Sequence, residues 1–578
     1  MAATLWQIRP GTTTAFVLCI STLAVAQDVP NDKCVLEGIV RNSVTHGALA
    51  KASIHLIPIA GSAQTPGYVG ATNGAGIFRF EGIAPGAYAI LVSRAGYSDD
   101  VLMKAGPEPV GAVLTFTAGQ ELTGMEISLV PYGGISGKVT GPDGEPLEDI
   151  RVDLIAAKWQ RGRRVYQSIG SSETDGTGEY RLDAPPGRYY IYAGVLSGSG
   201  PIAGIIRESP GKPELRLTGG YHPGATAWEG AAPVELQAGM EVGGIDFRLY
   251  LAPVFHVRGK LAAGAVHERF GGIVARLAGR INGQACDWDQ PASAMVLLDG
   301  SFDFSGVVPG PYFLYADNRG FFPGGNFRGV KVPLMVTARD QNGITGPVAQ
   351  WFDLKGRIRL AGEASASAVP DVEVIFEGSG ADQLDLWRSR VNPKPDGTFS
   401  ITGLTPDRYA VRIVNRNRGQ GGGFYLKSFL YQGRETAANW IDLTGGVAGE
   451  VELVLSDGVG SVEGTVHWPE EDENIARMAP AGELRAVLAP EKIPLADTRP
   501  ASTEVDQNGH FSLGNLAPGT YRAFAMNGYD EGLWENAEFL GRIAGQGTPV
   551  EVAEKGTIHV ELKVLRAGEA QQAETQLK

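Results

Sequence analysis

The chain has 578 residues, which is too many for one hydrophobic core and indicates several domains. Its net charge of −14 argues against a nucleic-acid partner, because such a partner requires a concentrated basic face. The 80 glycines and 35 prolines occur without low-complexity runs and predict many short strands and turns rather than long helices. A hydrophobic content of 43% is enough for packed cores and argues against disorder.

The first residues have the pattern of an export signal. Arg9 supplies a positive charge, residues 15–23 form an apolar stretch, and Ala24-Val-Ala26 is a small-residue cleavage site. We therefore predict a signal peptide over residues 1–26 and a mature chain that begins at Gln27. No later segment approaches the roughly 20 apolar residues of a membrane-spanning helix. The expected location is periplasmic, cell-surface-associated or extracellular, with no transmembrane segment in the mature chain.

Two cysteines, Cys34 and Cys286, remain after the predicted cleavage. They either pair in the oxidising compartment or stay as separate buried thiols. Two cysteines are too few for a disulfide framework, so each domain core must be stabilised by burial alone.

One motif occurs five times along the chain. It consists of an Asp/Asn-Gly turn, an aromatic residue, an apolar residue two positions later, Pro-Gly or Pro-Asp, and a tyrosine three positions after the proline. The first aromatics are Phe78, Tyr180, Phe302, Phe399 and Phe511, and the tyrosines are Tyr88, Tyr189, Tyr312, Tyr409 and Tyr521. Successive tyrosines lie 97 to 123 residues apart, which is the size of a whole sandwich domain.

The residues of the motif predict a structural role. Asp or Asn can hydrogen-bond its own turn, and glycine allows a positive φ. The aromatic and the apolar residue two positions later lie on one face of a strand. The second turn leads into a strongly apolar strand, such as residues 88–92, that would fill a core.

Each repeat also begins and ends with a strand. The opening strands contain Gly38, Gly137, Gly259, Gly356 and Gly464, and four closing strands alternate apolar and polar residues at 125–129, 245–249, 451–455 and 558–562. Such alternation is typical of strands with one face on a core. The sequence does not show where the closing strand of the third repeat lies. We predict an all-β tandem array of about five β-sandwich domains at 27–131, 132–252, 253–348, 349–457 and 458–566, followed by a polar tail at 567–578.

The string from Asp/Asn-Gly through the aromatic to Pro-Gly-x-Tyr, followed by Gly96-Tyr97, resembles the carboxypeptidase regulatory-like domain. The resemblance covers all five repeats and also extends to tandem-repeat secreted bacterial proteins. It implies a prealbumin-like (transthyretin-like) sandwich, related to immunoglobulin-like folds. In metallocarboxypeptidases this domain accompanies a separate catalytic domain and carries no catalytic residue. The fold is shared with carbohydrate-binding modules, so the resemblance also implies glycan binding as an alternative.

A search for catalytic or metal-binding patterns gives no site. The eight histidines are scattered, and the chain has no H-E-x-x-H and no G-x-S-x-G motif. The Asp175 and Asp506 turns superficially resemble calcium loops but lack the distal glutamate and helix pair of an EF-hand. We therefore expect no catalytic residue, no metal and no cofactor, and hence no enzyme.

Aromatic residues on loops are the remaining candidates for ligand contact. Trp159 and Tyr166 flank the basic cluster at residues 158–164, which we predict to be the solvated tip of a hairpin, and Trp228 lies in a long insertion of the second repeat. Indole and phenol rings can stack on sugars. The alternative is that each ring caps the end of its own sandwich.

Three functions are compatible with these observations. The first is an exported scaffold or interaction module built as a rod of five sandwiches. The second is a carbohydrate-binding protein that uses loop aromatics. The third is an accessory subunit of a secreted peptidase. The expected partner is a cell-envelope protein or a glycan.

Overall fold

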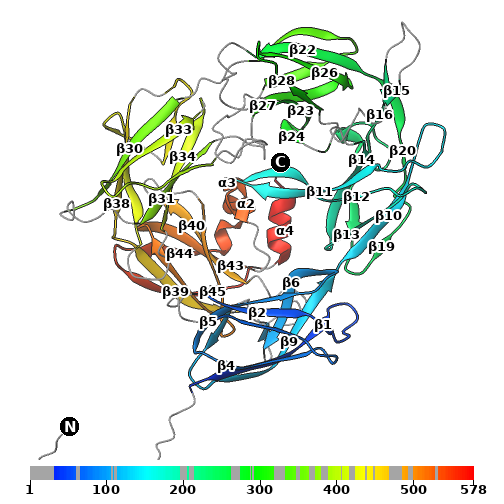
Figure 1. Ribbon diagram of the computed structural model, residues 1–578. Coiled ribbons are helices and arrows are strands. Elements are labelled where there is room, and N and C mark those ends of the chain that lie inside the picture. The colour runs from blue at the N-terminus through cyan, green and yellow to red at the C-terminus, as the bar shows by residue number, and fades with distance from the viewer. Residues whose placement is uncertain are drawn as a thin grey trace, which may run out of the picture.

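The computed structural model describes residues 32–577 except 60–65, 106–107, 110–112, 196–204, 207–213, 262–273, 287, 289–291, 318–331, 347–351, 363–370, 379–387, 405, 416–422, 437–438, 447–448, 468–483, 493–498, 527–530 and 566. The predicted signal peptide lies outside the described residues. Five β-sandwiches follow one another along the chain, so the predicted all-β tandem array is confirmed (Figure 1). The strands of domains 1 to 5 span 34–131, 133–253, 255–346, 352–456 and 460–563.

The first sheet of every domain is built around the strand that opens the repeat. This strand pairs antiparallel with the strand that carries the first motif aromatic, and parallel with the closing strand. The opening strands are β1 (Cys34–Asn42), β10 (Gly133–Thr140), β22 (Phe255–Leu261), β30 (Phe352–Leu360) and β39 (Gly460–His467). The motif strands are β4 (Ile77–Ile83), β13 (Glu179–Ala184), β26 (Ser301–Val307), β33 (Thr398–Leu404) and β42 (His510–Leu516). The closing strands are β9 (Glu121–Pro131), β19 (Glu241–Val242) with β20 (Phe247–Arg248), β29 (Gln341–Gly346), β38 (Val451–Ser456) and β45 (Thr557–Lys563).

The second sheet contains the strand that follows the Pro-Gly turn. In domain 1 its order is β3 (Tyr68–Ala71), β2 (Ser53–Pro58), β5 (Gly86–Ser93), β8 (Val113–Phe116). In domain 2 the strands are β12 (Arg163–Glu173), β11 (Arg151–Gln160), β14 (Gly187–Gly194), β17 (Gly220–Tyr221) and β18 (Val234–Leu236). In domain 3 they are β24 (Gln284–Cys286), β25 (Ala292–Met295), β23 (Val274–Ile281), β27 (Gly310–Asp317) and β28 (Val332–Val336). In domain 4 they are β32 (Arg388–Val391), β31 (Val372–Gly378), β34 (Arg408–Asn415) and β37 (Trp440–Asp442), and in domain 5 β41 (Ala501–Glu504), β40 (Arg485–Lys492), β43 (Gly519–Met526) and β44 (Thr548–Val552).

Additional elements decorate this common plan. The further strands are β6 (Tyr97–Ala105), β7 (Glu108–Pro109), β15 (Ile205–Ile206), β16 (Leu215–Thr218), β21 (Tyr250–Pro253), β35 (Tyr425–Tyr431) and β36 (Arg434–Glu435). The helical segments are η1 (Trp228–Gly230), α2 (Glu531–Trp534), α3 (Ala537–Ile543), η4 (Ala544–Gln546) and α4 (Ala567–Thr575). Among the described residues no helix is long and apolar enough to cross a membrane.

The glycine of each opening strand lies directly opposite the first motif aromatic. The cross-strand pairs are Gly38 with Phe78, Gly137 with Tyr180, Gly259 with Phe302, Gly356 with Phe399, and Gly464 with Phe511. A methyl group on Gly38 or Gly259 would lie only 2.6 Å from the Cζ atom of the paired ring. The ring therefore occupies the space that a side chain would fill, which explains why glycine and aromatic recur together.

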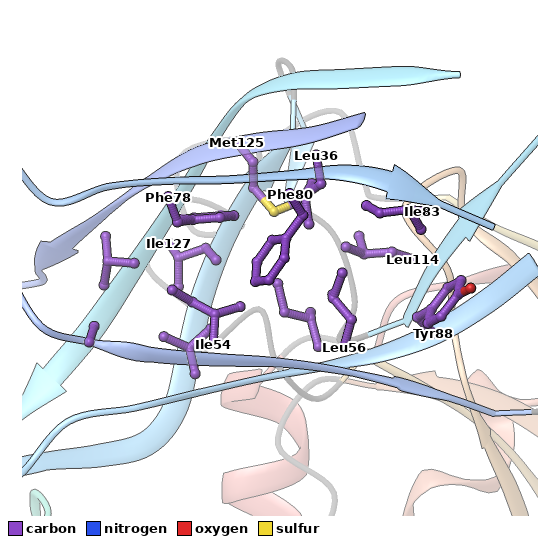
Figure 2. Close-up of a cluster of buried hydrophobic side chains, with 14 of the residues drawn as sticks. Leu36, Ile54, Leu56, Phe78, Phe80, Ile83, Tyr88, Leu114, Met125 and Ile127 are labelled. Atoms are coloured by element: carbon purple, nitrogen blue, oxygen red, sulfur yellow. The ribbon is translucent and has the colours of Figure 1, made fainter. Parts of the chain in front are cut away.

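The motif tyrosine is fixed by its hydroxyl group. The hydroxyls of Tyr88, Tyr189, Tyr312 and Tyr521 donate to the carbonyl four residues earlier, directly before the Pro-Gly turn, at 2.7 to 2.9 Å. This bond satisfies a polar atom on a ring whose body lies in the core, and burial raises the pKa of Tyr88 to about 12. The constant proline-to-tyrosine spacing follows from this geometry. All ten motif aromatics are buried, and Figure 2 shows Phe78 and Tyr88 in the core of domain 1.

The Asp/Asn turns are held by their own side chains. The Asn73 and Asp506 side chains each accept two backbone N–H groups of the turn, and Asp175 accepts two N–H groups and the Thr177 hydroxyl. Hydrogen bonds from the Ser301 hydroxyl and N–H, with Lys260 beside them, lower the pKa of Asp299 to about 2. Turn chemistry thus accounts for the resemblance to calcium loops.

The five domains do not form the expected rod. They surround a common centre, which contains the tip of the β11–β12 hairpin and helices α2, α3 and α4, and domain 5 returns to domain 1 (Figure 1). Val113 of domain 1 forms a β-bridge with Asp506 of domain 5. The rod prediction fails because the domains contact one another through surfaces far apart in the sequence. We call this arrangement the ring.

A buried carboxylate joins three domains at the centre of the ring. The Glu377 side chain of domain 4 is only 2% exposed. It pairs with Arg499 of domain 5, with Arg412 of its own domain at 3.5 Å, and with Arg161 of domain 2 at 3.9 Å. Arg161 also donates to the carbonyl of Gly378 at 2.5 Å. The prediction of a hairpin around Arg161 is correct, but its expected solvated tip is wrong, because the tip contacts domains 4 and 5.

The segment predicted as a polar tail forms helix α4. Ala573 is buried, and Ala570 and Leu577 pack against the cluster formed by Phe524, Trp534 and their neighbours. The tail therefore completes a core between domain 5 and the domain 2 hairpin instead of extending into solvent.

Gly356→Ala should destabilise domain 4 by about 1–3 kcal/mol, the usual cost of overpacking. The added methyl would meet the Phe399 ring and lie 2.6 Å from Val451 Cγ2. Gly445→Ala is the matched control, since nothing lies within 4 Å of its added methyl. Hydrogen exchange of domain 4 peptides should accelerate in the first variant and not in the second; equal exchange in both would contradict the role given to the glycine–aromatic pair.

Glu377→Gln should loosen the ring by about 3–5 kcal/mol, because it removes the buried negative charge that Arg161, Arg412 and Arg499 share. Glu373→Gln, on the same strand, removes only a pair with the exposed Arg390 at 3.6 Å and should cost at most about 1 kcal/mol. Small-angle scattering should show a larger radius of gyration for Glu377→Gln alone. An unchanged radius, with unchanged exchange in the β11–β12 hairpin, would refute the role of Glu377 in holding the ring.

Candidate functional site: the cleft between the first and last domains

A cleft of about 1230 Å³ lies where domain 5 meets domain 1. This volume exceeds that of most small-molecule pockets, which measure about 300–1,000 Å³. Val113 and Asp506, which form the β-bridge between the two domains, both line it. The cleft exists only because the ring closes, since its two walls come from opposite ends of the chain.

The wall from domain 1 is mostly apolar. It is the outward face of the second sheet, with Ala87 and Ala89 on β5, Val113 and Thr115 on β8, and Ile59 after β2. Ala89 lies between Ile57 and Val113 in the strand register, so the three side chains form a continuous row.

This apolar face continues beyond the cleft. Val69, Leu91 and Ile57 are 70%, 53% and 46% exposed. His55 pairs with both Val69 and Leu91 in the register, so the exposed residues lie on neighbouring strands of one face. Exposed apolar patches of this kind are typical of interaction surfaces.

The wall from domain 5 is polar. It is the outward face of the β42–β39–β45 sheet, where two rows of side chains cross the strands. The first row is Ser512, Glu463 and His559, and the second row is His510, Thr465 and Glu561. The His559 Nδ1 and Glu463 Oε2 atoms are 3.8 Å apart. Beside this grid, Arg485 pairs with Glu504 at 3.0 Å.

The side chain of Gln507 seals the junction of the two walls. Its Oε1 atom accepts the N–H of Thr115 at 2.7 Å, and its Nε2 atom donates to the carbonyl of Thr115 at 2.6 Å. An amide side chain thus takes the place of a neighbouring strand along the edge of β8, which protects that edge from other pairing.

The lining of the cleft combines an apolar sheet face with charged groups. No group of three or more His, Cys, Asp or Glu side chains within the described part of the chain could hold a metal ion. Of the described residues that line the cleft, the one aromatic is Phe511, and its ring belongs to the domain 5 core. The lining offers an apolar sheet face, carboxylates and a guanidinium, which are the groups that recognise amphipathic ligands.

Trp159, a predicted ligand contact, lies at the centre of the ring and is half-buried. Its Nε1–H donates to Glu574 of α4 at 2.7 Å, and the Arg164 guanidinium lies 5.5 Å from its ring centroid. The indole of Trp159 also packs against the hydrophobic cluster of domain 5. Trp159 thus contacts another domain of the same chain.

Tyr166 and Trp228 contact each other, with ring centroids 4.4 Å apart. Both are half-buried and pack, together with Tyr190, against a cluster that joins domain 2 to Cys286 and Trp288 of domain 3. The structure brings these two predicted residues together and places Trp159 elsewhere. Cys34 and Cys286 are separate buried thiols in domains 1 and 3.

Sequence reasoning did not identify the residues of the cleft. One local signal was present: residues 88–92 are apolar on both faces of β5, yet only Tyr88, Ile90 and Val92 fill the core of domain 1. A second signal is Gln507, which occupies the position where the turns of the first two repeats have Gly74 and Gly176.

The comparisons with known proteins give neither a family nor a function. No family model and no curated protein sequence matches the chain. Similar solved structures include the Bacillus anthracis TIE protein, at 12% identity over 55% of this chain and with a TM-score of 0.16; the match spans 51% of that protein, about half of its length. Others are the minor pilin GBS52 of Streptococcus agalactiae (12% identity, 38% of this chain, 96% of that chain, TM-score 0.21) and the shaft pilin SpaA of Lactobacillus rhamnosus GG (10%, 38%, 97%, 0.20). Likenesses this remote carry no functional argument.

Gln507→Ala should speed amide exchange in β8 about tenfold or more, because two hydrogen bonds to Thr115 are lost at about 0.5–1.5 kcal/mol each. Asn508→Ala is the control, since Asn508 lies in the same turn with an exposed side chain. Hydrogen-exchange mass spectrometry of peptides covering 113–117 reads this contact directly. Equal exchange in the two variants would show that Gln507 does not hold domain 1 against domain 5.

Proposed function

We propose that the protein is an exported, non-catalytic binding protein that holds a polypeptide ligand in the cleft between domains 1 and 5, with the ring as its scaffold. The observation that carries this proposal is the 1230 Å³ cleft with one apolar and one polar wall. Export is supported by the signal pattern of residues 1–26.

A polypeptide suits the lining better than a glycan does. Sugar rings are bound by flat aromatic faces, whereas the wall from domain 1 carries the aliphatic side chains of Ala87, Ala89, Val113 and Ile59, with Thr115 beside them. The loop aromatics proposed for a glycan, Trp159, Tyr166 and Trp228, pack between domains of this chain. Small aliphatic side chains and paired charges are the surface that peptide side chains recognise.

A selection from a random peptide library on the mature chain, residues 27–578, tests this function. Enriched peptides should lose at least tenfold in affinity to Ala89→Trp, whose indole would fill the cleft from the apolar wall. Ser93→Trp is the matched control, since Ser93 is exposed on the same strand outside the cleft. No enriched peptide, or peptides that bind Ala89→Trp as well as the unmodified chain, would reject the proposal.

A further inference from the structure

The two walls of the cleft indicate which polypeptides it takes. We infer that the ligand is an extended segment whose residues alternate between apolar and cationic, with the apolar side chains against domain 1 and the cationic ones against domain 5. This inference rests on the proposed function and specifies the ligand of the same cleft.

The charge of the lining selects a cation. Among the described lining residues, the ionisable groups apart from two histidines are four carboxylates and one guanidinium: Glu463, Glu504, Asp506, Glu561 and Arg485. Of these, Glu504 pairs with Arg485, and Asp506 accepts two N–H groups of its own turn. Glu463 and Glu561 lie on the sheet face, where Glu463 is 45% exposed and has only the imidazole of His559, at 3.8 Å, as an ion-pair partner among the described residues. A lysine or arginine placed there gains charge-assisted hydrogen bonds.

The spacing of the two walls selects an extended chain. Ala87 and Ala89 are two residues apart along β5, and Glu463 and Thr465 are two residues apart along β39. Side chains on one face of an extended peptide have the same spacing of about 6.6 Å, and alternate side chains point to opposite faces. An extended peptide between the walls therefore presents one set of side chains to each wall.

The narrow end of the cleft favours a strand over a helix. The walls converge at Val113 and Asp506, where the two domains are in β-bridge contact. An extended chain is the narrowest form of a polypeptide, whereas a helix with its side chains is about 10–12 Å wide.

Along β8, side chains rather than backbone pairing hold the segment. Gln507 occupies both the N–H and the carbonyl of Thr115, so the edge of β8 is not available for strand addition at that residue. Recognition at this wall then depends on the order of apolar and cationic residues.

Three capped octapeptides test this inference by isothermal titration calorimetry on the full mature chain. The first alternates lysine with valine, the second alternates glutamate with valine, and the third is a block peptide of four lysines followed by four valines. The lysine–valine peptide should bind at least tenfold more tightly than the other two, since only it combines the correct charge with the alternation. Glu561→Lys should weaken its binding at least fivefold. Glu551→Lys is the matched control, because Glu551 is exposed in the same domain and lies outside the cleft.

Equal binding of the glutamate–valine peptide would overturn the charge assignment, and equal binding of the block peptide would overturn the alternation. Binding of the lysine–valine peptide that is unaffected by Glu561→Lys would place the peptide elsewhere on the surface and also reject the inference. Two results together separate the inference from the proposed function. If Ala89→Trp abolishes binding of the library peptides and the lysine–valine peptide does not bind, the inference fails and the proposed function stands. If no peptide shows that dependence, the function itself fails.

Discussion

The ring depends on one buried carboxylate, that of Glu377. A buried charge is costly to remove from water and is tolerated only where opposite charges and hydrogen bonds surround it. Its partners Arg161, Arg412 and Arg499 belong to domains 2, 4 and 5, so the carboxylate is compensated only when these domains meet. An isolated domain 4 would leave it without two of these three arginines. The ion-pair cluster therefore does more than add stability: it makes the closed arrangement the one in which this charge is acceptable.

The contacts at the centre of the ring determine how domain 5 meets domain 1. Once domains 2, 4 and 5 are fixed, domain 5 lies beside domain 1, and the edge of β8 must be either paired or protected. The Gln507 amide performs this task with a side chain, which joins the domains without merging their sheets. The cleft is the space between two sheet faces that meet at Val113 and Asp506. Its position thus follows from the ring, and its chemistry follows from the two faces.

The sequence predicted the all-β tandem fold because the contacts within each repeat are local and recur along the chain. Gly356 opposite Phe399, or Tyr521 bonded to the carbonyl of Ala517, recurs at a constant spacing in the repeats, so five copies make the pattern visible. The ring was not predictable in this way. Trp159 and Glu574 are 415 residues apart, and their hydrogen bond occurs once. Amphipathic alternation tells which face of a strand meets its own core and carries no information about which distant domain covers the other face.

The outward faces of the second sheets show which contacts between domains the sequence pattern did not predict. In domain 2, Ile155 and Tyr192 point away from the domain core and are buried against domain 3; in domain 5, Val487 and Phe524 are buried against the C-terminal helices. Strands β11 and β40 are thus apolar on both faces because both faces are covered. In domain 1 the same sheet is also apolar outside, with Ile57 and Leu91, yet these two residues stay exposed next to the cleft. Domains 2 and 5 cover the corresponding face with other parts of the chain, whereas the described residues leave this face open beside the cleft, where the ligand that we propose would cover it.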